Sequence, residues 1–302
     1  MGTFPEDRLV HMPLYQPLAK YFFENQLFAR VVGFLIMLGN AFLLNYIVRK
    51  NQLLSRKSWL PALMFVVFSA CTPGLLWPHA SLFASFFLLL SLLLVLETYR
   101  QDKSLGAVFH VGLMVGLAAQ FYLPALVFLI FHLISLLILR PFIWREWVVI
   151  IIGAILPFIY VLFYFFMKDH TAGLTREYII EPIVHRSFFL KLPLADYVLA
   201  GGTGIVLLGS MGRFIAGSGT STMKTKKGIS VLIWFMVLSL AAILPAQHFG
   251  VDTFVFTIIP VAFFTSNYFL HSRKNWMSVL SFWLILAGIV FSYLFNAGII
   301  EI

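Results

Sequence analysis

The chain has 302 residues, of which 61% are hydrophobic and only 11% are charged. Soluble domains carry about 25% charged residues, so this composition excludes a soluble protein and indicates an integral membrane protein. The formal net charge of +9 comes from short basic clusters between apolar runs, a pattern typical of membrane topology signals and not of nucleic-acid binding.

Residues 1–30 are predicted to form an external tail with an amphipathic surface segment. The tail opens with PEDRLVHMPLY, Pro5–Tyr15, and Gln16–Arg30 then mixes apolar and charged residues. A tail that carries Arg8, Lys20 and Arg30 crosses a membrane reluctantly. We therefore expect a further span upstream of this sequence.

Glu6 and Asp7 are the candidate catalytic residues of the tail. A carboxylate at the membrane boundary can act as a general base or hold a divalent cation that bridges phosphate groups. A divalent cation is the cofactor that fits such acids, and the sequence has no haem, flavin or nucleotide signature. The alternative is an ordinary solvated tail whose acids mark it as external.

Apolar segments long enough for about ten membrane spans follow the tail, so we predict an all-α, polytopic transmembrane helical bundle. The first bundle, residues 31–166, has about six spans, and the second, residues 195–302, has about four. The segments are Val31–Val48, Leu60–Leu76, Ser81–Leu96, Leu105–Gln120, Tyr122–Leu139, Trp147–Phe166, Ala195–Met211, Ile229–Leu244, Phe254–Leu270 and Trp276–Phe295.

The stretch Leu105–Leu139 is either one long tilted helix or a hairpin that turns at Gln120–Pro124. The hairpin places most of the basic residues on one side of the membrane and most of the acids on the other. The basic side is then cytoplasmic. We expect Arg213–Lys227 to be a flexible cytoplasmic loop, because it is rich in Gly, Ser and Thr.

An external loop, residues 167–194, joins the two bundles. At helical spacing, Glu177, Glu181 and His185 share one face, where they can bind substrate or act as an acid–base pair. Arg176 and Arg186 are candidate phosphate ligands. The alternative is a surface helix held by exposed ion pairs. Smaller polar contributions on the same face are expected to ring a cavity. They come from Trp77, His79, Gln120, Tyr122, Asp196, Gln247, His248 and Asp252.

Other polar or small residues within the spans are assigned to packing. Gly112 and Gly116 form a GxxxG pair that brings two helices together. His110 and His132 lie within spans, and we assign them structural roles. No Asp, Glu, Lys or Arg falls in the middle of a predicted span, which argues against an ion-driven transporter.

Four runs resemble an uncharacterised family of polytopic inner-membrane proteins from Bacteroidota-type bacteria. They are PEDRLVHMPLY, NAFLLNYIVRKNQLLSRKSWLPALMFVV, FYLPALVFL and LILRPFIWREWVV, which lie between Pro5 and Phe166. The resemblance implies a multi-pass protein of the bacterial inner membrane. It also implies a span before the PEDRL segment, in agreement with the expectation from charge.

The layout is distantly similar to membrane glycosyltransferases that use polyprenyl-phosphate sugars. That similarity implies that Glu6 or Asp7 deprotonates an acceptor, and that Arg8, Arg176 and Arg186 neutralise the lipid phosphate. The expected partners are membrane lipids and a polyprenyl-phosphate-linked sugar, with no nucleic acid. The sequence leaves a non-enzymatic membrane scaffold or assembly partner open as the alternative, and disfavours a transporter.

Overall fold

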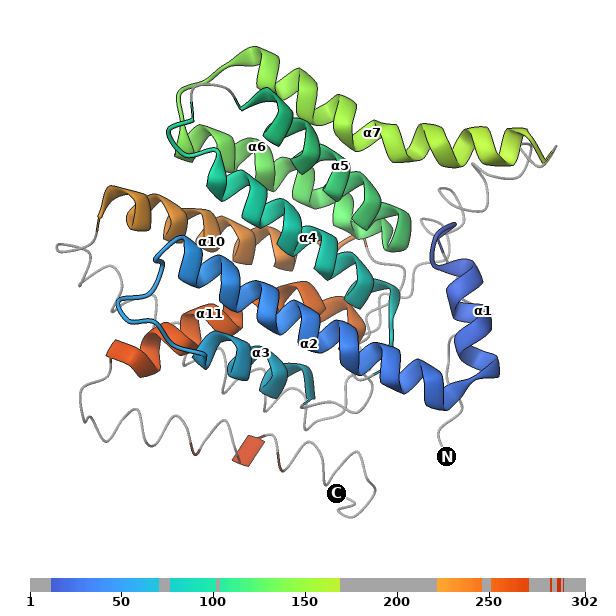
Figure 1. The fold of residues 1–302 in the computed structure, drawn as a ribbon, viewed down its shortest axis with the longest axis horizontal. Coiled ribbons are helices and arrows are strands. Elements are labelled where there is room, and N and C mark those ends of the chain that lie inside the picture. The colour runs from blue at the N-terminus through green and yellow to red at the C-terminus, as the bar shows by residue number, and fades with distance from the viewer. Residues whose placement is uncertain are drawn as a thin grey trace.

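The computed structural model describes residues 12–70, 77–101, 104–168, 222–245 and 251–271, with isolated helical residues from Trp283 to Val290. Every regular element in these ranges is a helix, which confirms the all-α class (Figure 1). The helices are α1 (Gln16–Glu24), α2 (Gln26–Lys50), α3 (Leu60–Ala70), α4 (Ala80–Glu97), α5 (Leu105–Phe121), η3 (Leu123–Leu126), α6 (Val127–Leu139), α7 (Trp144–Phe166), α10 (Met223–Ala241), η6 (Val251–Phe254) and α11 (Val255–His271).

Three of these helices, α2, α4 and α7, are long and apolar enough to cross a membrane. Four further apolar stretches are shorter, including α3, α5, and η3 with α6. By length and composition, the described helices are consistent with a membrane protein, but they do not support the predicted count of ten spans. Ala195–Met211 lies outside the described residues, as does nearly all of Trp276–Phe295.

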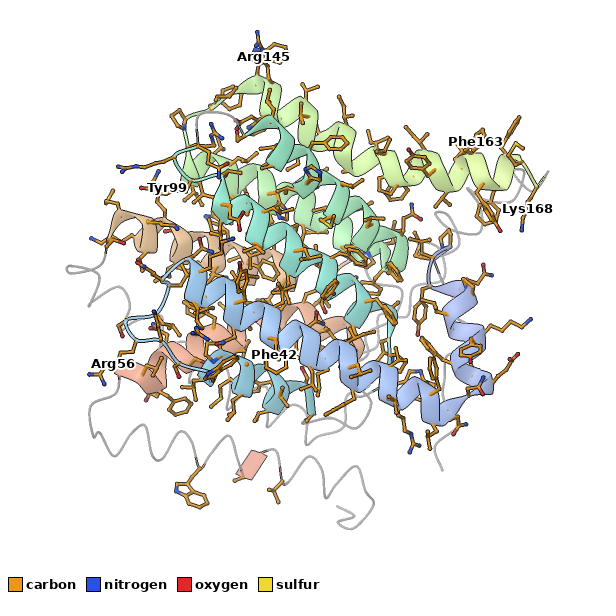
Figure 2. All side chains as sticks on the ribbon, viewed as in Figure 1. Phe42, Arg56, Tyr99, Arg145, Phe163 and Lys168 are labelled. Atoms are coloured by element: carbon orange, nitrogen blue, oxygen red, sulfur yellow. The ribbon has the colours of Figure 1, made fainter. Side chains whose placement is uncertain are left out.

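The helices run between two ends of a bundle, and one end collects the basic residues. Lys50, at the end of α2, pairs with Glu97 at the end of α4. Arg140, at the end of α6, donates through Nη2 to the Gln101 carbonyl oxygen at 2.9 Å. We call this the basic end. Figure 2 shows Arg56, Tyr99 and Arg145 on that side and Lys168 on the other.

The hairpin alternative for Leu105–Leu139 is confirmed. The chain leaves helical geometry at Tyr122, which has φ −145° and ψ 106°, and the following Pro124 lies in the short helix η3. The contact between Arg140 and Gln101 then brings the end of α6 back to the start of α5. The two helices are therefore antiparallel.

α1 lies across the opposite end of the bundle (Figure 1). Phe22 of α1 stacks on Phe83 of α4, with ring centroids 6.2 Å apart. Ala19 and Phe22 are the buried residues of α1, whereas its Lys20 and Glu24 are exposed. This helix therefore has the amphipathic surface character that the sequence predicts. We call this side the α1 end.

The prediction of a flexible loop at Arg213–Lys227 is partly wrong. α10 begins at Met223, six residues before the predicted Ile229, so Lys224, Lys226 and Lys227 are helical. Thr222 caps the helix, because its side-chain oxygen accepts a hydrogen bond from the Thr225 N–H. The apolar stretch alone did not reveal this start, since the first two turns are polar.

α5 and α7 approach each other through three glycines. A Cβ atom at Gly112 would lie 2.0 Å from the Ile150 carbonyl oxygen, and one at Gly116 would lie 2.4 Å from that of Ala154. Gly153 of α7 faces the Phe109 carbonyl of α5 in the same way, at 2.4 Å. The packing role predicted for the GxxxG pair is thus confirmed.

Beyond this contact α7 bends along its length (Figure 1), and it carries Pro157 inside the helix. Proline cannot donate a hydrogen bond to the preceding turn, which permits such a bend. Leu162, Phe163 and Phe166, which follow the proline, are exposed. Apolar side chains that face outward in this number suit contact with lipid.

Candidate functional site

The last residues of the PEDRLVHMPLY stretch are docked at the α1 end. The Tyr15 hydroxyl donates to the Pro78 carbonyl oxygen at 2.8 Å, and the Leu14 N–H donates to the Gln120 carbonyl oxygen at 3.4 Å. Met12 and Tyr15 are buried, with 6% and 1% of their surface exposed. Met12–Tyr15 are therefore packed against the bundle, whereas Glu6 and Asp7, to which the solvated-tail alternative applies, lie outside the described residues.

An aromatic cluster forms the surface on which this segment lies. Phe83 of α4 stacks on Phe121 of α5, with centroids 5.5 Å apart and ring planes within 2°. Tyr15 lies 6.0 Å from the same Phe83 ring, and Tyr122 lies 5.7 Å from Phe256 of α11. Aromatic contacts of this kind have defined geometry, so they hold the docked segment, α4, α5 and α11 in fixed relative positions.

Gln120 is a buried polar residue at this site whose side-chain oxygen is not hydrogen-bonded to any described residue. Its side chain is 1% exposed, and its Oε1 atom has no hydrogen-bond partner among the described residues. A buried carbonyl oxygen without a donor costs about 1–3 kcal/mol. Because this oxygen is buried, a ligand has as little access to it as to any core atom.

Two other polar residues expected on this face are also placed here. Trp77 is buried and packs with Phe22 and Ala29. His79 is the N-cap residue of α4, where its carbonyl oxygen accepts from the Leu82 N–H at 3.0 Å. The structure thus brings Trp77, His79 and Gln120 to one end of the bundle, as expected.

The predicted catalytic and substrate-binding residues lie outside the described residues. They are Glu6, Asp7 and Arg8 of the tail, and Arg176, Glu177, Glu181, His185 and Arg186 of the loop. The same holds for Asp196, Gln247 and His248. Among the described residues, no three His, Cys, Asp or Glu side chains gather in a way that could hold a metal ion.

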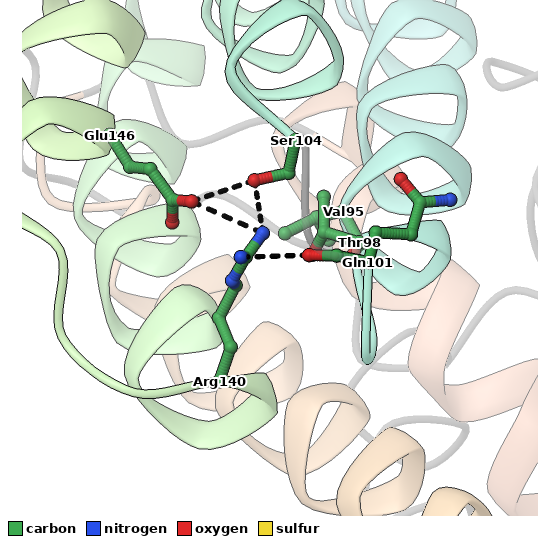
Figure 3. Close-up of polar contacts among 6 residues, drawn as sticks. All are labelled: Val95, Thr98, Gln101, Ser104, Arg140 and Glu146. Atoms are coloured by element: carbon green, nitrogen blue, oxygen red, sulfur yellow. Dashed lines mark hydrogen bonds and ion pairs between the residues drawn. The ribbon is translucent and has the colours of Figure 1, made fainter.

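A buried ion pair at the basic end was missed by sequence analysis (Figure 3). Arg140 Nη1 lies 3.1 Å from Glu146 Oε1, and both side chains are almost fully buried. The Ser104 hydroxyl donates to the same carboxylate oxygen at 2.6 Å and also accepts from Arg140. This cluster ties together the start of α5, the end of α6 and the start of α7.

The ion pair is structural, because both side chains are buried and two of the three guanidinium nitrogens of Arg140 make contacts within the cluster. Arg140 also donates to the Gln101 carbonyl, and Glu146 is 2% exposed, so a substrate has little access to the carboxylate. One signal in the sequence could have revealed it. Glu146 is an acid within a basic segment, six residues after Arg140, across a turn that contains Pro141.

The two histidines within the helices engage their own backbone. Nδ1 of His110 lies 2.6 Å from the Gly106 carbonyl oxygen, and Nδ1 of His132 lies 2.6 Å from that of Phe128. Both carbonyls belong to the preceding helical turn. These contacts agree with the structural roles assigned from the sequence.

Comparison with known proteins identifies a family model, described as a family of unknown function (DUF6427), that matches residues 12–301. The match begins at Met12, the first residue of the docked segment, and Glu6, Asp7 and Arg8 precede it. No curated protein and no solved structure matches the chain.

Proposed function

Because the chain belongs to the DUF6427 family, whose function is unknown, we propose a function from its own geometry: a multi-pass protein of the bacterial inner membrane that acts on a lipid-linked sugar at the α1 end. The proposed protein crosses the membrane about ten times in total. The shorter helix α5 supports it, since its 17 residues cover about 26 Å along the bundle, close to the hydrocarbon thickness. The excess of basic residues at the opposite end supports a cytoplasmic position for that end.

The observation that carries this proposal is the docked N-terminal segment. Buried Met12 and Tyr15 hold the chain against the ends of α4 and α5. Asp7 precedes Met12 by five residues, and five residues span at most about 18 Å. In the proposal, the acids of the tail therefore act at the α1 end.

The proposed reaction transfers the sugar from a polyprenyl phosphate to an acceptor hydroxyl. Glu6 or Asp7 removes the hydroxyl proton, the oxygen forms a bond to the sugar C1, and the bond from C1 to the phosphate oxygen breaks. The polyprenyl phosphate leaves with the electron pair. Arg8, Arg176 and Arg186 neutralise its charge, and Glu177, Glu181 and His185 contribute to substrate binding. A divalent cation is the cofactor that this set of acids fits.

A membrane scaffold or assembly partner is the second candidate, and the family match supplies the observation that favours it. The matched residues contain the docked Met12–Tyr15 segment but not Glu6 or Asp7. A scaffold requires the docked segment and its aromatic platform, and it has no need of the acids.

A transfer assay with a double variant separates the two candidates. The full chain is reconstituted in liposomes with a radiolabelled polyprenyl-phosphate hexose and an envelope extract that supplies acceptor hydroxyls, and transfer of label out of the lipid phase is measured. We expect Glu6→Gln with Asp7→Asn to abolish release while abundance and insertion stay normal, because substitutions of solvated side chains change stability by only about 0.5 kcal/mol.

The matched control is Glu24→Gln, which removes an exposed acid of α1 at the same end. It should leave release unchanged. Normal release by the double variant, or full complementation of a deletion strain by it, would contradict catalysis by the tail and favour the scaffold.

A further inference from the structure

Among the described residues, the basic end carries more cations than carboxylates. Glu97 pairs with Lys50, and Glu146 pairs with Arg140. The remaining cations at this end make no ion pair with the described part of the chain. They are Arg49, Arg56, Lys57, Arg100, Arg145, Lys224, Lys226 and Lys227. An anion from outside the described chain can therefore be bound here.

Two of these cations converge on one aromatic ring. Lys227 Nζ lies 5.5 Å from the centroid of the Tyr99 ring, and Arg100 Cζ lies 5.6 Å from it. The two charges are thus no more than about 11 Å apart, although Lys227 belongs to α10 and Arg100 follows α4. Like charges beside one ring repel each other, and an anion bound by both removes the repulsion.

The backbone holds the Lys227 side chain in position, and it takes an unusual conformation at Arg100. Lys227 Nζ donates to the Leu139 carbonyl oxygen, at the end of α6, at 3.1 Å. Arg100 has a φ of 59°, a left-handed conformation that is unfavourable for any residue with a side chain. Glycine would avoid that cost. An arginine at a position that glycine fits better indicates that the charge of Arg100 has a role.

Lys224 extends the cluster. It precedes Lys227 by three residues in α10, so the two side chains lie on neighbouring positions of one helix face. Lys224 is exposed, and Lys227 is half-buried. Two lysines on this face and Arg100 across the ring supply the several donors that a phosphate group accepts.

The same face of α10 carries apolar surface farther from the basic end. Trp234 follows Lys227 by seven residues, which places it on the same face about 10 Å deeper in the bundle. It is 41% exposed, and Val237, one turn further, is 46% exposed. A ligand with a phosphate and a long apolar chain matches this arrangement, whereas a soluble phosphate uses only the cations.

We propose that Arg100 and Lys227, which both lie over the Tyr99 ring, bind together with Lys224 the phosphate headgroup of an anionic phospholipid whose acyl chain lies along Trp234. This site is at the opposite end of the bundle from the proposed sugar-transfer site and does not depend on it.

The test measures binding of phosphatidylglycerol to the purified full chain in detergent by native mass spectrometry, with phosphatidylcholine as the competing neutral lipid. A charge-assisted hydrogen bond from a cation to the phosphate contributes about fivefold to binding, whereas an exposed cation that does not touch the phosphate contributes little. We expect Arg100→Gln with Lys224→Gln to weaken phosphatidylglycerol binding about 25-fold and to leave phosphatidylcholine binding unchanged.

The matched control is Arg56→Gln with Lys57→Gln, which removes two exposed charges from the connection between α2 and α3 at the same end. It should change binding less than twofold. An equal loss of phosphatidylglycerol binding in both double variants would show that binding depends on the overall surface charge. That result would contradict the proposed site. If the first double variant does not fold, as judged by circular dichroism, Lys224→Gln alone should still weaken binding about fivefold, and no change would overturn the proposal.

Two further measurements identify the source of the phosphate. Glycerol 3-phosphate, which has the headgroup chemistry without acyl chains, should not displace the lipid at millimolar concentration. Trp234→Ala should weaken lipid binding severalfold while the cations remain in place. Displacement by glycerol 3-phosphate at the same concentration as the lipid would assign the site to a soluble phosphate and contradict the proposal.

Discussion

Replacing Gly112 by alanine tests the contact that holds α7 to the bundle. The added Cβ atom would lie 2.0 Å from the Ile150 carbonyl oxygen, well inside the usual carbon–oxygen contact distance, and backbone cannot rotate away as a side chain can. The helices must separate by about 1 Å, which forfeits a quarter to a half of the dispersion energy across the contact. Overpacking of this kind costs about 1–3 kcal/mol.

Gly39→Ala in α2 is the matched control, because a Cβ atom there meets nothing within 4 Å. Alanine favours the helix over glycine by about 1 kcal/mol, so this variant should be slightly more stable than the parent. Free energies of unfolding are measured by titrating the protein in mild detergent with dodecyl sulfate and following the helical signal. If the Gly112→Ala variant is as stable as the Gly39→Ala variant, the close approach of α5 and α7 is refuted.

A double variant tests whether the glycines form one interface. Gly153 of α7 faces the Phe109 carbonyl at 2.4 Å, and once the helices have separated for Gly112→Ala, a second Cβ atom meets less resistance. Gly112→Ala with Gly153→Ala should therefore cost less than the two single variants added together. Strict additivity would indicate that the two contacts are independent.

Three further substitutions probe the polar contacts by the same unfolding measurement. Glu146→Leu should cost about 3–5 kcal/mol because it leaves Arg140 buried and unpaired, and Arg140→Met in the same chain should recover much of the loss; no recovery would argue against the pair. Gln52→Gly should stabilise by about 1 kcal/mol, since Gln52 has a φ of 51°, and a loss would show that its side chain has another use. Tyr15→Phe should cost about 1 kcal/mol through the lost hydrogen bond to Pro78, and no change would contradict the docking of the N-terminal segment.

The apolar helices were predictable from the sequence because a membrane span has few alternatives to a helix. α4, observed at Ala80–Glu97, was predicted at Ser81–Leu96, and the hairpin at Tyr122 was predicted from charge. The start of α10 was not, because a capping threonine and three lysines contribute no apolar signal. Helix ends of this kind are set by local hydrogen bonds.

The candidate site was less predictable than the helices. Trp77, His79 and Gln120 were expected on one face, and the structure places them at one end. Docking of Met12 and Tyr15 was not foreseen, because it depends on contacts with residues more than sixty positions away, such as Pro78. The pairing of Arg140 with Glu146 was missed because both residues were interpreted only by the side of the membrane on which they lie.

The orientation of the two ends is the central claim, since a sugar-transfer site at the α1 end requires that end to face outward. Single cysteines at Lys20 of α1 and at Ser55 of the basic end, both exposed, test it in a Cys71→Ser chain with an impermeant maleimide applied to intact cells. We predict labelling at position 20 in intact cells, and labelling at position 55 only after the inner membrane is permeabilised. Labelling at position 55 in intact cells, with protection at position 20, would contradict the proposed orientation and the external site with it.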